Sequence, residues 1–251
     1  MLEFELGGGA TDWISTAANT SATWHMSDVR VQASVFNINS QLMEACSAHV
    51  LSGKSLLIPL KTFTCTSSAL PDASEFDVSI ARSFRRLCTL FETFTNTGGA
   101  GAKEVNTFYS PVSTTNQDNF ESVLHIGSKR WSDFDRIGSA QHYYYLLQGL
   151  GYANSLVSSA NISLGAYKSS SAVFCWDCEK VPQATMTGYN TSGGQSITAS
   201  WKKMGTETGN RPKKTFFVAH YDAVLELSST SAQVHSQING TTKLITLIPS
   251  L

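Results

Sequence analysis

The chain has 251 residues, a formal net charge of −1 and a pI near 6.6, a balance that gives no electrostatic footprint for nucleic acid or an anionic membrane surface. Charged residues make up 15% of the chain, against about 25% in a typical globular protein. So few charges suit a protein that packs against copies of itself, and they suit an ordinary Ser/Thr-rich β protein equally well. The length allows one large β domain or two small ones, with a core that needs no disulfides.

The cysteines and the first residues are not those of a disulfide-rich secreted protein. The five cysteines are odd in number and scattered along the chain, so we expect mostly reduced thiols. The opening MLEFEL lacks the basic and apolar regions of a signal peptide. No apolar run approaches the roughly 18 residues needed to span a bilayer. We therefore expect neither secretion by a signal peptide nor membrane insertion.

The N-terminal third is predicted to contain an arm, a strand and a short helix. Residues 1–23 form the predicted flexible arm, because residues 6–23 are rich in Gly, Ser and Thr. Alternating valines predict a strand at 29–35. Asn39 or Ser40 can then cap a helix that ends at Gly53 and whose apolar stripe is Leu42, Met43, Cys46, His49 and Val50.

Three strands are predicted next, and the third is apolar on both faces. The first, 54–65, contains Pro59, which lacks a ladder N–H and so indicates an edge or a bulge. Alternation predicts the second at 76–84. The third, 86–95, has Leu87 and Phe91 on one predicted face and Cys88, Leu90 and Phe94 on the other. Such a strand is buried on both faces or covered by a partner.

The remainder alternates between loops, one helix and further strands. A flexible loop is expected at 96–103, and a polar loop at 127–135 carries two aromatic residues, Trp131 and Phe134. Ser139 can cap a helix with the stripe Tyr143, Leu146, Leu147 and Leu150. Strands are predicted at 120–126, 173–178, 184–189, 195–202, 215–227, 234–238 and 244–248.

Residues 215–227 carry the strongest structural information. Every odd position from 217 to 227 is apolar or aromatic, which predicts a strand roughly 40 Å long with one face in a core. With no alternation of strands and helices, the strand count predicts an all-β protein: an antiparallel β-sandwich of jelly-roll type with two short helices in its connections. Residues 24–251 are predicted to form this jelly-roll domain.

Two groups of residues offer chemistry, and each has a simpler interpretation. Cys175 and Cys178 form a CxxC pair that could bind zinc or exchange disulfides, but no second ligand pair exists and the pair lies in a predicted strand, so two structural cysteines are favoured. His220 and Asp222 could act as a base with its orienting carboxylate, but no nucleophile accompanies them. We therefore predict no catalytic, cofactor-binding or metal-binding residue and no enzymatic activity, and a small-molecule substrate is not expected.

A small basic cluster flanks the loop 204–212. Lys202, Lys203, Lys213 and Lys214 border this loop, and Arg211 lies in it. The default interpretation is a solvated loop, and weak contact with a phosphate backbone is the alternative.

Several ordered segments resemble a known family. They are 24–35, 53–61 (GKSLLIPLK), 91–94 (FETF), 126–131 (IGSKRW), the helix 139–150 and 217–227. In this order they resemble the C-terminal half of double jelly-roll major capsid proteins of Polinton-like viruses and virophages. The resemblance implies a capsid protein that forms trimers of hexagonal outline, with no catalytic residues to carry over. Family members have two jelly rolls per chain, and this chain is too short for two.

The leading hypothesis is therefore a structural viral capsid protein that self-assembles into trimeric, pseudo-hexameric capsomers of an icosahedral shell. Its expected partners are copies of itself, as a homotrimer, and other capsid proteins. Its expected location is the virion, after synthesis in the host cytoplasm or nucleus. The candidate interface residues are Leu90, Phe94, Trp131 and Phe134. The alternative is a glycan- or receptor-binding jelly-roll module that uses the loops 96–104 and 127–137.

Overall fold

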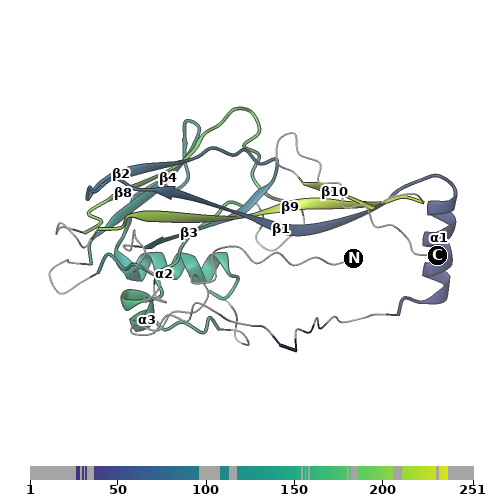
Figure 1. Cartoon of the computed structure of the whole chain (residues 1–251), viewed down its shortest axis with the longest axis horizontal. Coiled ribbons are helices and arrows are strands. Elements are labelled where there is room, and N and C mark those ends of the chain that lie inside the picture. The colour runs from purple at the N-terminus through teal and green to yellow at the C-terminus, as the bar shows by residue number, and fades with distance from the viewer. Residues whose placement is uncertain are drawn as a thin grey trace.

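Two antiparallel sheets face one another in the structure, a computed structural model that describes residues 27–28, 30, 32, 37–95, 108–112, 118–153, 155, 157, 159–179, 181, 186–205, 211–229 and 232–236 (Figure 1). Sheet A has the strand order β1-β9-β3-β7, with β10 also paired to β9, and sheet B has the order β2-β8-β4-β5, with β6 also paired to β4. The antiparallel β-sandwich predicted from the sequence is confirmed.

The strands follow the predicted alternation closely. Sheet A contains β1 (Leu56–Ala69), β3 (Leu87–Thr95), β7 (Phe174–Asp177), β9 (Lys214–Leu227) and β10 (Ala232–Ser236). Sheet B contains β2 (Phe76–Ile80), β4 (Glu121–Ile126), β5 (Lys129–Arg130), β6 (Arg136–Ile137) and β8 (Ile197–Lys202). Of the predicted strand 184–189, only Tyr189 forms a bridge, to Leu87, and residues 182–185 lie outside the described part.

The helices are α1 (Ser40–Leu51), α2 (Gly138–Gly149) and α3 (Leu164–Ser169). The first two were predicted, whereas α3 was not. The predicted cap of α2 was wrong by two residues: Ile137 is the N-cap, and Ser139 lies inside the helix, where Asp118 accepts hydrogen bonds from its N–H and its hydroxyl. The arm 1–23, the loop 96–103, the strand 244–248 and all of the strand 29–35 except Arg30 and Gln32 lie outside the described residues.

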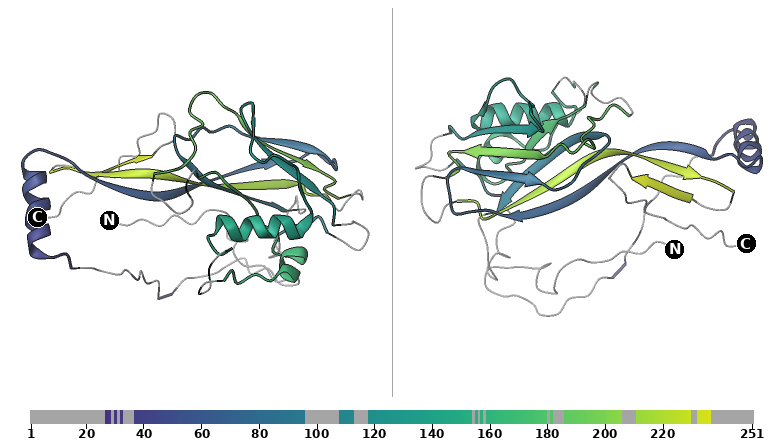
Figure 2. Two further views of the ribbon diagram at one scale, coloured as in Figure 1. Left: turned by 180° about the vertical axis from the view of Figure 1, so that it is seen from behind. Right: turned by 90° about the horizontal axis from the view of Figure 1, so that it is seen from above.

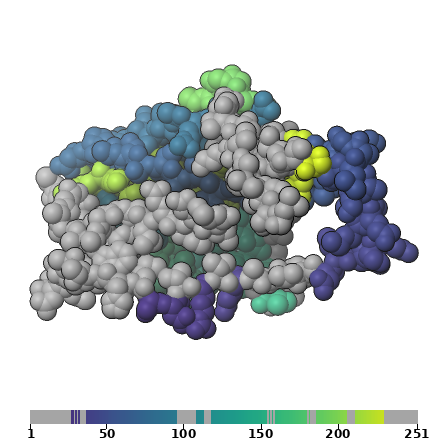
Figure 3. Space-filling view, turned by 45° about the vertical axis from the view of Figure 1, so that its right-hand side comes forward, coloured from purple at the N-terminus to yellow at the C-terminus, as the bar shows by residue number. Residues whose placement is uncertain are grey.

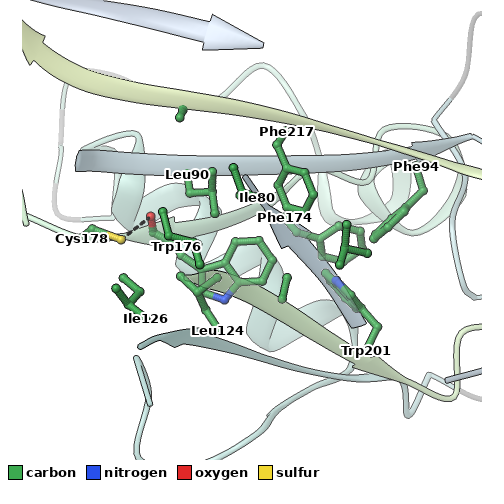
Figure 4. Packing of buried hydrophobic residues seen from close by; sticks show 14 of the residues in the cluster. Ile80, Leu90, Phe94, Leu124, Ile126, Phe174, Trp176, Cys178, Trp201 and Phe217 are labelled. Carbon is green, nitrogen blue, oxygen red and sulfur yellow. Dashed lines mark hydrogen bonds between the residues drawn. The ribbon is translucent and has the colours of Figure 1, made fainter. Parts of the chain in front are cut away.

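Aromatic side chains fill the space between the two sheets (Figure 4). Trp201 of β8 is central: its ring lies 4.5 Å from that of Phe174 and 5.1 Å from that of Phe94, between ring centroids. The alternating residues of β2 and β8 face this core, which is why both strands show strict period-two burial. Trp176 and Phe217 extend the cluster along sheet A.

A β-bulge near the start of β3 changes which side chains face the core. The register with β9 shifts between Leu87 and Thr89, so Leu87 joins Leu90 and Phe94 in the core. Phe91 faces the other way, toward α2. The predicted grouping of Leu87 with Phe91 was therefore wrong, because strict alternation does not hold across a bulge.

Two helices cover the outer face of sheet A over β3 and β7. Leu146 of α2 and Tyr167 of α3 pack with Cys175 and with Phe91 in a second, smaller cluster. The approach of α2 is close, because a Cβ on Gly149 would lie 2.2 Å from the Sγ of Cys175. The chain itself thus supplies the cover that the two-faced strand β3 requires.

The longest strands run beyond the sandwich. β1 and β9 pair over 14 residues each, whereas β3 pairs with only residues 214–221 of β9 and β10 takes its place at 223–227. Sheet B lies over one end of this ribbon, and α1 stands at the other end (Figures 1 and 2). We call residues 38–63 together with residues 220–227 of β9 the distal arm.

A buried carboxyl group joins the two sheets. Glu92 of β3 is 1% exposed, and its carboxyl oxygens accept hydrogen bonds from Trp201 Nε1 at 3.0 Å and from the Thr215 hydroxyl at 2.9 Å. Burial raises the pKa of Glu92 from the ordinary value of 4.5 to about 8, and the two hydrogen bonds only partly oppose this. At neutral pH the folded chain therefore holds Glu92 as a neutral acid.

We predict that this acid makes stability fall as pH rises. Between pH 4.5 and about 8 the folded chain keeps the proton that the unfolded chain releases, so the free energy of unfolding decreases across that window by a few kcal/mol, as an order of magnitude. Glu92→Gln should remove this decrease, because an amide does not titrate in this window. The amide can still accept from Trp201 and donate to Thr215, so the contacts between the sheets are kept. Urea unfolding at a series of pH values measures the effect, with exposed Glu75→Gln as the control. Equal pH slopes in wild type and Glu92→Gln would contradict it.

Candidate assembly surface

Exposed apolar side chains concentrate on the distal arm. Among the described residues, sixteen large hydrophobic side chains are exposed, and seven of them fall within residues 38–63. These seven are Ile38, Leu42, Met43, Leu51, Leu57, Ile58 and Phe63. A group of this kind on one projecting element indicates an interaction surface.

Helix α1 forms because of its ends, and its apolar side chains remain uncovered. The Asn39 side chain accepts a hydrogen bond from Gln41 N at 3.0 Å, and Gly53 follows the last turn with φ +81°. The predicted helix and caps are confirmed, but no residue of α1 is buried, and Met43 and Leu51 are 61% and 81% exposed. Figure 3 shows this segment standing at one end of the molecule. A 12-residue helix is marginal in water by itself, so a partner surface would stabilise it.

An aromatic row leads from the distal arm across the outer face of sheet A to Phe91. The Phe63 ring lies 6.1 Å from the ring of His220, which lies 5.4 Å from that of Phe91. Phe63, on β1, is 67% exposed. The pKa of His220 is lowered, mainly because the ring is partly buried and to a smaller extent because the positive charge of Lys61 is near. The row continues the apolar surface of the arm onto the sheet.

His220 and Asp222 do not form the acid–base pair considered from the sequence. His220 packs between the rings of Phe63 and Phe91. Asp222 is 2% exposed and lies near Cys88. The pKa of Cys88 is raised to about 12, first by burial and second by the charge of Asp222. The described contacts of His220 are thus those of a packed ring.

The four predicted interface residues divide into two groups. Leu90 and Phe94 are fully buried in the chain's own core, so they do not lie on a free surface. The prediction that these two residues contact a partner was therefore wrong. The face of β3 that carries them packs against sheet B of the same chain. Trp131 and Phe134 lie on the loop 127–135, and neither belongs to the distal arm.

The loop 127–135 holds its tryptophan and leaves its phenylalanine free. Trp131 Nε1 donates to the Asp177 carbonyl at 2.6 Å, and its ring contacts that of Tyr189 at 4.8 Å. Lys129 Nζ lies 5.0 Å from the Trp131 ring centre, which adds a cation–π contact. Phe134 is 53% exposed, so it remains the predicted interface residue with a free surface.

The two cysteines of the CxxC pair are both buried. Cys175 packs under α2 and Cys178 packs in the main core, so they face opposite sides of the sheet, as predicted. Burial raises the pKa of both thiols. Within the described ranges, no group of three or more His, Cys, Asp or Glu side chains is arranged to hold a metal ion.

The basic cluster around loop 204–212 is partly neutralised by its neighbours. Lys203 forms an ion pair with Glu121, and Arg211 donates to the carbonyl of Asp72 at 3.0 Å. Lys214 lies 4.8 Å above the ring of Phe216. These contacts favour the solvated-loop interpretation.

Among the residues that the structure describes, no helix is both long and apolar enough to cross a membrane.

We predict that thiol reactivity follows this placement. A maleimide should label exposed Cys65 in the native chain, whereas Cys88, Cys175 and Cys178 should react only on unfolding, because burial blocks the reagent and disfavours the thiolate. Peptide mapping by mass spectrometry at increasing urea measures the order. Early labelling of Cys175 and Cys178, or a disulfide between them, would contradict a structural role.

Comparison with known proteins gives likenesses of fold only. No protein-family model matches the chain, and no curated protein matches it. The quasi-atomic model of the PBCV-1 virus capsid is 13% identical, with a TM-score of 0.42 over 72% of this chain and 51% of that one. The cryo-EM structure of the Sputnik virophage is 14% identical, with a TM-score of 0.41 over 73% of this chain and 39% of that one. The chain thus spans about half or less of the length of each.

Proposed function

We propose that the chain is a structural protein of a viral capsid that associates with copies of itself through the distal arm. The observation that carries this proposal is the concentration of exposed apolar side chains on an element that projects from a completed sandwich. The sandwich has a filled core, and two helices cover part of sheet A, whereas the arm has apolar surface to spare.

The energies favour an assembly that engages more than one arm. Full burial of a large apolar side chain contributes about 1.5–3 kcal/mol, so covering the exposed parts of the seven in the arm contributes about 6–13 kcal/mol in all. Association costs about 4–15 kcal/mol. One arm against a neighbour is therefore marginal, and a symmetric contact with two arms is favourable.

The finer assignments rest on the sequence resemblance. In this proposal the chain contributes to homotrimeric, pseudo-hexameric capsomers of an icosahedral shell, with other capsid proteins as further partners and the virion as its location. The chemistry is that of interfaces and includes no catalytic step. Large apolar interfaces are typical of permanent assemblies.

A second candidate function is a glycan- or receptor-binding module. The observation that favours it is Phe134, exposed on the loop 127–135 beside a shallow pocket of about 220 Å³ lined by Lys129, Arg130, Trp131, Ser132 and Asp133. Aromatic and polar side chains around a hollow suit sugar stacking. A glycan array probed with the purified chain, with Phe134→Ser as the control, tests this candidate.

We predict that the triple variant Leu42→Ser, Met43→Ser, Leu51→Ser lowers self-association, because it removes much of the apolar surface of α1. Light scattering coupled to size-exclusion chromatography, with electron microscopy of the larger species, measures the effect. The matched control is Tyr144→Ser with Leu150→Ser, which removes exposed apolar side chains at α2. A wild-type chain that stays monomeric at high concentration, or an equal loss in the control, would overturn the proposal.

A further inference from the structure

β1 presents a long outer edge that none of the described strands pairs with. β1 is the terminal strand of sheet A, and no other strand of the described chain pairs with the side that faces away from β9. This edge is 14 residues long. Proteins normally shorten, charge or cover such edges, because their free N–H and C=O groups can pair with another chain.

Pro59 indicates which backbone groups face the open side. Proline has no N–H to give to a ladder, so in a paired strand it is placed where that N–H would point away from the neighbour. Since backbone groups alternate along a strand, those of Lys61, Phe63 and Cys65 then point to the open edge as well. The centre of β1 thus presents donors and acceptors ready for an antiparallel neighbour.

The side chains around Phe63 are compatible with a copy of the same strand. Phe63 is 67% exposed, and Lys61 and Cys65 on either side of it are exposed too. In an antiparallel pair centred on Phe63, the two phenylalanines face each other, and Lys61 faces the Cys65 of the other copy. This register avoids a like-charge pair, whereas centring on Lys61 would place two lysines opposite each other.

The same register brings the distal arm onto a second molecule. Antiparallel pairing about Phe63 lays residues 56–62 of one β1 along residues 64–70 of the other. Each arm then runs beside the sandwich end of its partner, so its exposed apolar side chains lie next to a second molecule. A two-fold contact engages both arms at once, which the energies above favour. Because a trimer has no internal two-fold axis, this contact joins chains of two different capsomers.

We infer that β1 pairs antiparallel with β1 of a second copy about a two-fold axis at Phe63, so that two copies of sheet A become one continuous sheet. This inference rests on the proposed self-association and adds the partner strand and its register. The occupant is a second copy, because this antiparallel register places Phe63 opposite Phe63 and brings no like charges together.

A cysteine introduced at position 61 tests the register. In Lys61→Cys, the new thiol faces native Cys65 of the other copy, so mild oxidation should give a covalent dimer whose 61–65 linkage is identified by mass spectrometry. Adding Cys65→Ser should abolish the linkage. Thr62→Cys is the matched control, because residue 62 points to the opposite face and should not join Cys65. Failure of Lys61→Cys to cross-link, or equal cross-linking by Thr62→Cys, overturns the inference.

A charge at the axis tests the contact in solution. Phe63→Lys places two lysines face to face and should weaken dimerisation by about tenfold or more, measured by sedimentation equilibrium. Tyr144→Lys, at an exposed position on α2, should leave it unchanged. Self-association that is lost in the α1 triple variant but unchanged in Phe63→Lys would overturn this inference and leave the proposed function standing. A monomeric wild-type chain would overturn both.

Discussion

The continuous pairing of β1 with β9 is the constraint on which the rest of the molecule depends. Because both strands keep one register over 14 residues, they form a single ribbon that is longer than the sheet facing it. One half of the ribbon supplies the floor of the sandwich, and the other half has no opposing sheet. The same backbone hydrogen bonds therefore create a filled core at one end and an apolar projection at the other.

The two ends differ in how polar groups are treated. In the sandwich, Glu92 is satisfied by partners from both sheets, and His142, whose pKa burial lowers to about 3, lies between Ser122 and the Gly138 carbonyl. On the arm, α1 carries one acidic residue and one histidine and buries nothing. Fixed buried networks rigidify a core, whereas a helix with a single carboxylate and several exposed apolar side chains suits docking. The buried polar networks and the exposed apolar helix thus lie at opposite ends of the β1–β9 ribbon.

Much of the architecture could be predicted from the sequence, and the failures have physical causes. The alternation from 217 to 227 predicts β9, and Asn39 with Gly53 predicts α1, because both signals are local. The bulge after Leu87 leaves no local pattern, and the six residues of α3 are too few for a helical period. Burial of Leu90 and Phe94 could not be assigned to the chain or to a partner, because a strand's apolar faces do not name what covers them. The stripe of α1 misleads for the same reason, since an uncovered helix has the same pattern as a covered one.

The contact between α2 and β7 has a consequence for how this sequence can drift. Gly149 leaves room for the sulfur of Cys175 only because it has no side chain, and even a methyl group there would overlap that atom. The two positions are therefore expected to vary together: a diverged relative with alanine or serine at 149 should carry a smaller residue at 175. Such paired replacements would identify the contact between α2 and β7 in relatives whose sequences have diverged too far for alignment by eye.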